Sequence, residues 1–268
     1  MTNDDSRITI DASRTSRQDA RFRQLQAAYF EQADAQKFNW QTADAYLAVT
    51  ERRLLRHAGV RSGERVLEVG CGEGGNLRLL SADRPGTVGV DLSRSKVRWA
   101  KRTLGAGAFL CSDAVSLPFR DGVFDVVLCR DVLHHVRAKQ AVVAELFRVC
   151  RPQGRVVVIE PNGRNPIMWL LGLAVPAERD LLHNSPDRVV DLVRQGARNR
   201  ARAELVQPLP IGRVLFHYRV GFPRLSSWLS GAVLAGEALL ARLIPLDRWA
   251  YIVVTVSKGG VPVPVGGM

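Results

Sequence analysis

The sequence has few cysteines, and their spacing excludes the common metal motifs. Cys71, Cys111, Cys129 and Cys150 form no C-x-x-C pair and show no histidine-flanked metal spacing, so neither a zinc site nor a dithiol redox motif is expected. Each cysteine lies in or beside an apolar run that is typical of a core strand or helix. We therefore expect four buried free thiols rather than metal ligands or a disulfide.

Long apolar runs are also lacking. The first twenty residues contain no apolar segment of the kind found in a signal peptide, and no stretch approaches the roughly 18 continuous apolar residues that a membrane span requires. A cytoplasmic location is therefore expected. The polar segment 1–20 and the tail 259–268 are expected to be disordered and flexible, respectively.

Acidic residues are outnumbered by basic ones, 26 to 38, which gives a formal net charge of +12. Such a charge suits an anionic partner, for example nucleic acid or an acidic lipid surface. The arginines, however, are scattered along the chain rather than clustered beside aromatic residues, as a biased composition alone would produce. Nucleic-acid binding is therefore disfavoured, peripheral membrane contact stays open, and the sequence does not indicate an oligomeric state.

A repeated alternation of apolar runs and helical stretches begins at residue 65. The apolar runs are RVLEVG, TVGVD, AFLCSD, FDVVLCR and RVVVIEP, and the segments 75–83, 93–103 and 138–150 between them suit helices. Strands that alternate with helices form βαβ units, whose right-handed crossovers produce a parallel sheet. The predicted fold class is α/β, with a Rossmann-like, doubly wound and mostly parallel sheet.

The alternation is absent on both sides of this region. Apolar residues at helical spacing predict two leading helices over 21–36 and 42–58. Beyond residue 162 the pattern is lost until YIVVTVS, which predicts an edge strand that closes the sheet. We expect a core with its leading helices over 21–162, followed over 163–258 by an elaboration that covers the acceptor site and ends in the closing strand.

A glycine-rich turn follows the first predicted strand and contains Gly70, Gly72 and Gly74. Glycine permits positive φ and lets a ligand approach the backbone closely. The turn also fits a dinucleotide-binding fingerprint loosely, because Gly75 falls at its third glycine position. Glu68 favours S-adenosylmethionine (SAM) over NAD, because a carboxylate attracts the ammonium of a methionine moiety, directly or through water, and repels a pyrophosphate.

Acidic residues end the next two predicted strands. Asp91 stands where a carboxylate can accept both hydroxyls of an adenosine ribose, although a strand-end aspartate can also be a helix cap or a turn residue. Asp113 could accept the exocyclic amine of adenine. The spacing of the turn and the two acids predicts an adenosine site.

These motifs together resemble the class I SAM-dependent methyltransferases, particularly those that act on small molecules. VLEVGCGEGG resembles the first motif of that family, GVDLS the second, SDAVSLPFRDGVFDVVLCRDVLHHV the adenine and post-strand-four motifs, and ELFRVCRPQGRVVVIEP the entry into strand five. The resemblance covers about residues 60–162. It implies these cofactor-binding residues: Glu68, Gly70, Gly72 and Gly74 at the methionine end, Asp91 at the ribose with Leu92 following it, Asp113 and Ala114 at the adenine, and Arg130 near the methionine portion.

Glu73 departs from the family pattern, in which a threonine or serine is frequent. An extra carboxylate therefore either faces the cofactor or points to solvent.

Methyl transfer from a sulfonium depends mainly on alignment, and a base is needed only when the acceptor must lose a proton. His134 and His135 follow the fourth strand, which ends at the cleft in open α/β sheets, so they are the candidate catalytic residues. The alternative is that one packs in the interior and the other lies on the surface. Asp131 and Glu160 do not form the carboxylate set of metal-dependent catechol-type relatives, so no metal is predicted.

The acceptor is expected to be a small and hydrophobic molecule, such as a natural-product, quinone or lipid-like intermediate. The segment after residue 162 is rich in large apolar residues, which predict an apolar pocket or a face resting on lipid, with ordinary core packing as the alternative. They are Trp169, Leu170, Leu171, Leu173, Phe216, Tyr218, Phe222, Trp228 and Leu229. A nucleic-acid methyltransferase, a non-catalytic SAM-binding protein and an NAD-dependent oxidoreductase stay as alternatives, although the Asn-Pro-Pro-Tyr type motif of DNA and RNA enzymes is absent.

Overall fold

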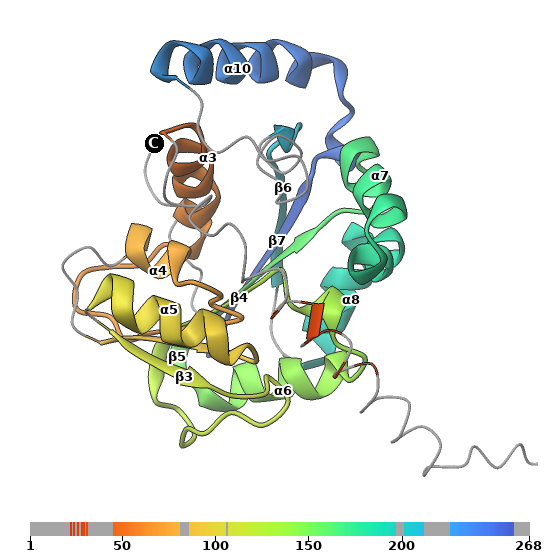
Figure 1. Ribbon diagram of the computed structural model, residues 1–268. Helices are drawn as coiled ribbons and strands as arrows, with labels where there is room; N and C mark the ends of the chain where they lie inside the picture. The colour runs from red at the N-terminus through yellow and green to blue at the C-terminus, as the bar shows by residue number, and fades with distance from the viewer. Residues whose placement is uncertain are drawn as a thin grey trace, which may run out of the picture.

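The computed structural model describes residues 45–80, 86–105, 107–196, 201–211 and 226–259, together with Phe22, Gln24, Gln26, Ala28, Tyr29 and Glu31 (Figure 1). The predictions for 1–20, for most of 21–36 and for the tail after Gly259 lie outside the described residues. The same holds for Phe216, Tyr218 and Phe222.

A seven-stranded sheet forms the centre of the described structure, with the order β3-β2-β1-β4-β5-β7-β6. The strands are β1 (Val66–Val69), β2 (Thr87–Asp91), β3 (Ala108–Cys111), β4 (Phe124–Arg130), β5 (Cys150–Pro161), β6 (Ala201–Val206) and β7 (Tyr251–Ser257). The pairs from β3 through β5 are parallel. All five strands that the alternating runs predicted are present, which confirms the doubly wound, mostly parallel sheet.

The prediction that YIVVTVS closes the sheet as an edge strand is wrong. β7 pairs antiparallel with β5 on one side and with β6 on the other, so it lies inside the sheet. β6 takes the edge and was not predicted, because its sequence alternates alanine with Arg202 and Glu204 rather than forming an apolar run. Charged side chains are common on edge strands, where they discourage pairing with another chain.

Helices cover both faces of the sheet. They are α3 (Ala45–Leu55), α4 (Gly75–Leu80), α5 (Arg94–Leu104), α6 (Lys139–Val149), α7 (Pro166–Ala174), α8 (Pro186–Gly196) and α10 (Ser227–Leu240), with short 3-10 helices η1 (Arg56–Ala58), η2 (Leu133–His135), η3 (Pro176–His183), η4 (Ala241–Leu243) and η5 (Leu246–Arg248). α3, α4, α5 and α6 match the segments predicted as helical. Among the described helices, none is long and apolar enough to cross a membrane.

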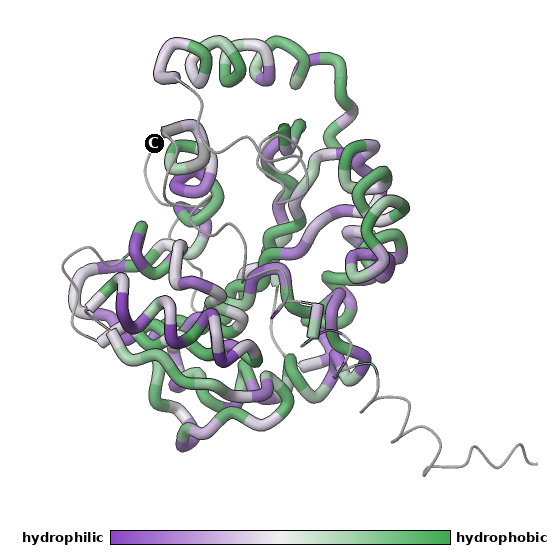
Figure 2. Tube along the Cα trace, viewed as in Figure 1, coloured by the Kyte–Doolittle hydropathy of each residue, from purple (hydrophilic) through white to green (hydrophobic). Residues whose placement is uncertain are grey.

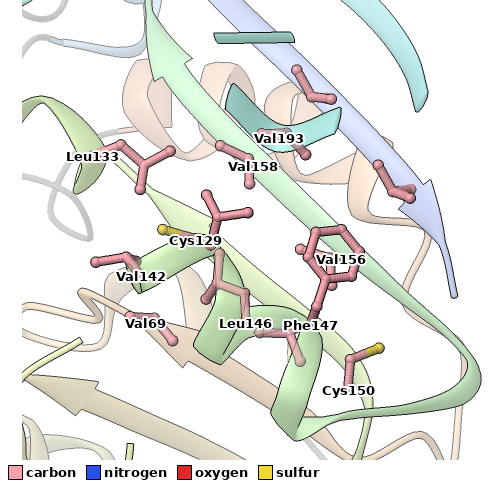
Figure 3. Close-up of a cluster of buried hydrophobic side chains, with 14 of the residues drawn as sticks. Val69, Cys129, Leu133, Val142, Leu146, Phe147, Cys150, Val156, Val158 and Val193 are labelled. Atoms are coloured by element: carbon pink, nitrogen blue, oxygen red, sulfur yellow. The ribbon is translucent and has the colours of Figure 1, made fainter. Parts of the chain in front are cut away.

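Alternation of side chains along the strands divides the core into two clusters. Val156 and Val158 of β5 pack toward α6 and α8 (Figure 3), whereas Val157 and Ile159 pack toward α3, α4, α5 and α7. This follows from the period of two in a β-strand. Burial on both faces requires apolar residues at every position, which is why the central strands read as continuous apolar runs.

The prediction of four buried thiols is wrong for one cysteine. Cys71, Cys129 and Cys150 are buried, but Cys111, the last residue of β3, is exposed. All four thiols are free. β3 lies at the sheet edge opposite β6, where one side of the strand has no neighbouring strand to cover it.

The order of the strands reverses between β1 and β4. From β1 the chain winds outward to β2 and β3, then returns to β4 on the other side of β1. In open α/β sheets, ligands bind at the carboxyl ends of the strands on either side of such a reversal. The glycine-rich turn follows β1, and Arg130 ends β4.

Candidate active site

The three glycines of the turn all have positive φ, +78° at Gly70, +52° at Gly72 and +79° at Gly74. They differ in their surroundings. A Cβ atom on Gly70 would overlap Cγ2 of Val132 in the loop after β4, and one on Gly74 would lie 2.5 Å from Cδ1 of Leu104. A Cβ atom on Gly72 would have no heavy atom closer than 4.0 Å. Gly70 and Gly74 are therefore required for packing, whereas Gly72 borders open space.

Asp91 ties the end of β2 to the glycine turn. Its Oδ2 accepts a hydrogen bond from the backbone N–H of Gly72 at 2.8 Å, and its Oδ1 accepts one from Ser93 at 2.8 Å. A carboxylate offers about four acceptor sites, so two bonds from the protein leave room for two hydroxyls. Asp91 can therefore hold the glycine turn, as observed, and still accept the ribose hydroxyls, as predicted.

The other residues predicted at the adenosine site lie beside Asp91. The backbone N–H of Ser112 donates to the Asp91 carbonyl at 3.0 Å, which holds the end of β3 against the end of β2. Asp113 follows directly and its Oδ1 accepts a bond from Val115 N at 3.1 Å. Leu92 is 44% exposed, and Ala114 is half-buried. The carboxyl ends of β2 and β3 thus lie side by side at the predicted adenosine site.

Glu68 is fully buried beneath the turn. Its Oε1 accepts a hydrogen bond from Nδ2 of Asn76 at 2.5 Å, and its Oε2 has no hydrogen-bond partner among the described residues. Burial raises the pKa of Glu68 to about 8, against the opposing effects of the Asn76 bond and the Arg130 charge. A buried carboxyl oxygen without a partner is unfavourable by itself, and an ammonium group or a water molecule would satisfy it.

Arg130 links this carboxyl group to α3. Its Nη1 donates to Oδ1 of Asn76 at 2.9 Å and to Oε2 of Glu51. The side chain is only 3% exposed, and its guanidinium carbon lies 5.6 Å from the ring centroid of Tyr251. Burial opposes the charged form of Arg130, but the Glu51 carboxylate holds its pKa above the ordinary value. The site therefore contains a buried, permanently charged guanidinium close to Glu68.

Glu73 does not point to solvent, which excludes one of the two predicted environments, and that it faces the cofactor stays a prediction. Its Oε1 lies 3.9 Å from Nζ of Lys96 on α5, and its side chain is mostly buried. The departure from the family pattern thus places a carboxylate opposite a lysine on the neighbouring helix.

His134 lies between two carboxylates and has no exposed surface. Its Nδ1 lies 2.7 Å from Oε2 of Glu160, and its Nε2 lies 3.2 Å from Oε2 of Glu178. Burial opposes the charged imidazolium, but the charge and hydrogen bond of Glu160, followed by those of Glu178, raise the pKa of His134 to about 10. A histidine that holds its proton at neutral pH and has both nitrogens engaged is unsuited to act as a general base, so the geometry does not support that prediction for His134.

His135 has the opposite character. Its side chain is 12% exposed, and its ring centroid lies 3.9 Å from that of His134. Burial, together with the positive charge of His134, lowers the pKa of His135 to about 4. It is therefore neutral at pH 7 and keeps the role of candidate base.

The two histidines and Glu178 place possible metal-ligand atoms within 4.8 Å of one another. Both ring nitrogens of His134 already face carboxylate oxygens, Nδ1 that of Glu160 and Nε2 that of Glu178, so a metal ion bound here would have to displace at least one of these contacts. The prediction that the reaction needs no metal stays a prediction.

Several residues of the site were not predicted from the sequence. Glu51 and Glu178 lie far along the chain from the motifs that they contact, and no local pattern marks them. Asn76 was within reach of sequence reasoning, because it is the polar residue that directly follows the glycines, at the second position of α4. Its contacts with both Glu68 and Arg130 could not be read from spacing.

Comparison with known proteins agrees with this geometry. The family profile described as "Methyltransferase domain" matches residues 67–158. The demethylmenaquinone methyltransferase of Beutenbergia cavernae is 40% identical over 109 residues, which are 41% of this chain and 45% of that protein. The 27-O-demethylrifamycin SV methyltransferase of Amycolatopsis mediterranei is 34% identical over 130 residues, 44% of this chain and 48% of that protein. The chain thus spans less than half the length of these two relatives.

A solved structure shares the fold. Phosphoethanolamine N-methyltransferase 2 of Haemonchus contortus, determined in complex with S-adenosyl-L-methionine, superposes with a TM-score of 0.55 at 19% identity and covers 77% of this chain and 51% of that one. With the family match and the strand order, these findings confirm the predicted fold class and, for residues 67–158, the predicted family and cofactor type. Residues 67–158 form a methyltransferase domain of the class I, SAM-dependent family.

Proposed function

We propose that the chain transfers a methyl group from SAM to a small, apolar acceptor. The observation that carries the proposal is the buried Oε2 of Glu68, which lacks a hydrogen-bond partner among the described residues and sits under a turn with open space at Gly72. An ammonium group at the methionine end of SAM satisfies that oxygen. An ammonium group favours the ionised form of Glu68, whereas the anionic pyrophosphate of a dinucleotide disfavours it.

Asp91, Asp113 and the exposed Leu92 then face the adenosine part. Asp91 keeps its bonds to Gly72 and Ser93 and accepts the ribose hydroxyls with its remaining lone pairs. Because the same carboxylate supports the turn and the ribose, a bound cofactor and an ordered turn stabilise each other.

SAM supplies an activated methyl group on a positively charged sulfur, so the protein contributes mainly proximity and alignment. Arg130 is paired with Glu51, and it fixes the position of Asn76 and, through it, that of Glu68. His135 is the neutral base that can take a proton from a hydroxyl acceptor. An amine or carbon acceptor does not need this step.

The part of the chain that follows the methyltransferase domain has exposed apolar residues that suit an apolar acceptor. The relatives named above act, by their names, on a demethylmenaquinone and a demethylrifamycin, and α7 and α10 expose large apolar side chains. These observations favour a quinone, natural-product or lipid-like acceptor over nucleic acid.

Two measurements test the proposal. Isothermal titration calorimetry with SAM, S-adenosylhomocysteine and NAD should show binding of the first two only, and NAD binding without SAM binding overturns the cofactor assignment. Incubation of the protein with deuteromethyl SAM and a lipid-soluble metabolite extract should then produce a product three mass units heavier than that from unlabelled SAM, absent from the Gly72→Val variant. Label that enters RNA but no small molecule contradicts the acceptor class.

A further inference from the structure

The buried residues of α10 are polar, whereas several of its large apolar residues are exposed. Ser230 and Glu237 are buried, whereas Trp228 is 74% exposed and Leu239 is 64% exposed. A surface helix of a globular protein normally has the reverse arrangement. Glu237 accepts a hydrogen bond from the hydroxyl of buried Tyr46 on α3, so a polar contact helps to attach α10 to α3.

Exposed large apolar residues also lie on the turns after α10 and on α7. Nδ2 of Asn165, the N-cap of α7, donates to the carbonyl of Arg248 in η5 at 2.8 Å, and Nδ2 of Asn162 donates to the carbonyl of Asp247 at 2.9 Å. η5 is therefore held against the start of α7. Figure 1 shows the segment that leads from α10 to β7 passing beside α7, and Figure 2 shows α7 as mainly hydrophobic. We call Trp169, Leu170, Trp228, Leu239, Leu243 and Leu246 the apolar face.

Charged side chains lie at the margins of the apolar face. α7 contains no charged residue, and the only charged residue of α10 is the buried Glu237. Arg242 and Arg248 are exposed on the segment between α10 and β7, with Asp247 as the exposed acid there. Arg164 precedes α7 and pairs with Asp187 on α8 at 2.9 Å.

We propose that the apolar face lies in the headgroup region of a lipid bilayer that contains anionic lipids. Helices that lie in this interface bury an apolar side by about 5–10 Å, and arginines at their margins reach the headgroups with their long stems. Each copy of the chain carries a formal charge of +12, so two copies repel each other, whereas an anionic bilayer attracts the chain. This inference goes beyond the proposed methyl transfer and does not depend on it.

The test is flotation of the full chain with large unilamellar vesicles, either of pure phosphatidylcholine or with about 30% phosphatidylglycerol. The chain should float with both, more strongly with the anionic vesicles, and this preference should shrink as NaCl is raised. The double variant Leu243→Gln/Leu246→Gln keeps the charge and should lower the partition coefficient by about tenfold per leucine. Leu110→Gln, at an exposed leucine on β3, is the matched control and should float like the parent chain.

The charged margin is tested separately with Arg242→Gln/Arg248→Gln. This variant should lose about fivefold per arginine on anionic vesicles and almost nothing on phosphatidylcholine. Circular dichroism and SAM calorimetry verify that each variant is folded. Three results overturn the proposal: no flotation with either vesicle, an equal loss in Leu110→Gln, or a dimer in analytical ultracentrifugation that Leu243→Gln/Leu246→Gln converts to monomer. The last of these would assign the face to a second copy.

Discussion

Nδ1 of His134 lies 2.7 Å from Oε2 of Glu160, with both side chains fully buried. The same carboxylate group accepts backbone N–H bonds from Val132 and Leu133, and Nδ2 of Asn184 donates to it at 3.2 Å. Glu160 therefore fixes the loop after β4 as well as the imidazole. The pair is structural, and its predicted effect is on stability.

Replacing His134 by Asn should destabilise the fold by about 3 kcal/mol, because it leaves the Glu160 charge buried without its partner. The folded pKa of His134, about 10, lies above its unfolded value of about 6.5. The stabilisation is therefore complete below about pH 6.5 and is lost as pH rises through 10. Urea unfolding of both chains at pH 6, 8 and 10 should show the difference shrinking, and His183→Asn, at an exposed histidine, should change little. A constant difference across this range contradicts the assignment.

His135→Ala should lower turnover of a hydroxyl acceptor by about a hundredfold or more, the typical contribution of a general base. SAM affinity should hardly change. A histidine with an ordinary pKa near 6.5 would give a rate that rises between pH 6 and 8. With the pKa of His135 lowered to about 4, the neutral form is already dominant and the rate should be flat over this range. A titration near pH 6.5 would contradict His135 as the base, and unchanged turnover would leave alignment as the source of catalysis.

Gly70→Ala and Gly72→Ala should separate packing from binding. The added methyl group at Gly70 would overlap Val132, so that variant should lose several kcal/mol of stability through overpacking. At Gly72 the methyl group meets only open space and a φ of +52°, which costs roughly 1 kcal/mol. Gly72→Ala should therefore stay folded while SAM affinity falls, as measured by thermal unfolding and calorimetry. Equal unfolding of both variants would show that Gly72 does not border the ligand.

Asp91→Ala should weaken SAM binding by about tenfold to a hundredfold, since hydrogen bonds to a charged group contribute roughly 1.5–3 kcal/mol. The bonds from Gly72 and Ser93 to this carboxylate add an expected loss of stability. Asp91→Asn keeps one acceptor oxygen and should show smaller losses in both. Unchanged affinity in a folded Asp91→Ala protein would remove the residue from the site.

SAM binding at pH 7 should release close to one proton from Glu68. Its pKa of about 8 in the unliganded protein means that it is protonated at pH 7, and an ammonium placed against it favours the carboxylate. Calorimetry in phosphate and in Tris, whose ionisation enthalpies differ, measures the proton number. Glu68→Gln should reduce it to zero. Equal proton release in the variant would assign the proton to another group.

The sheet could be predicted where each strand is apolar on both faces, as in β1, β4 and β5, because burial leaves a continuous apolar run in the sequence. β6 could not, since an edge strand with Arg202 and Glu204 carries no such run. The place of β7 was missed for a related reason. Its apolar run predicts a strand. Because β6 was not predicted, β7 was expected to lie at the edge of the sheet.

The candidate site shows the same limit: its local motifs could be predicted from the sequence, but contacts between distant elements could not. The glycine turn and Asp91 are local motifs whose spacing predicts their chemistry, and the structure brings them together at the carboxyl ends of β1 and β2. The difference between His134 and His135 could not be predicted, because it arises from Glu160 and Glu178 on distant elements. Two adjacent histidines with the same sequence surroundings thus have pKa values shifted in opposite directions.

Because β7 lies between β5 and β6, its synthesis determines when the sheet can be completed. β6 pairs with β7 and not with β5, although it leaves the ribosome first. Until residues 251–257 emerge, the outer edge of β5 has no partner strand and β6 has none either. The nascent chain therefore presents an unpaired apolar edge for the whole time in which α7, α8 and α10 are made, which is the kind of surface on which chains aggregate and to which chaperones bind.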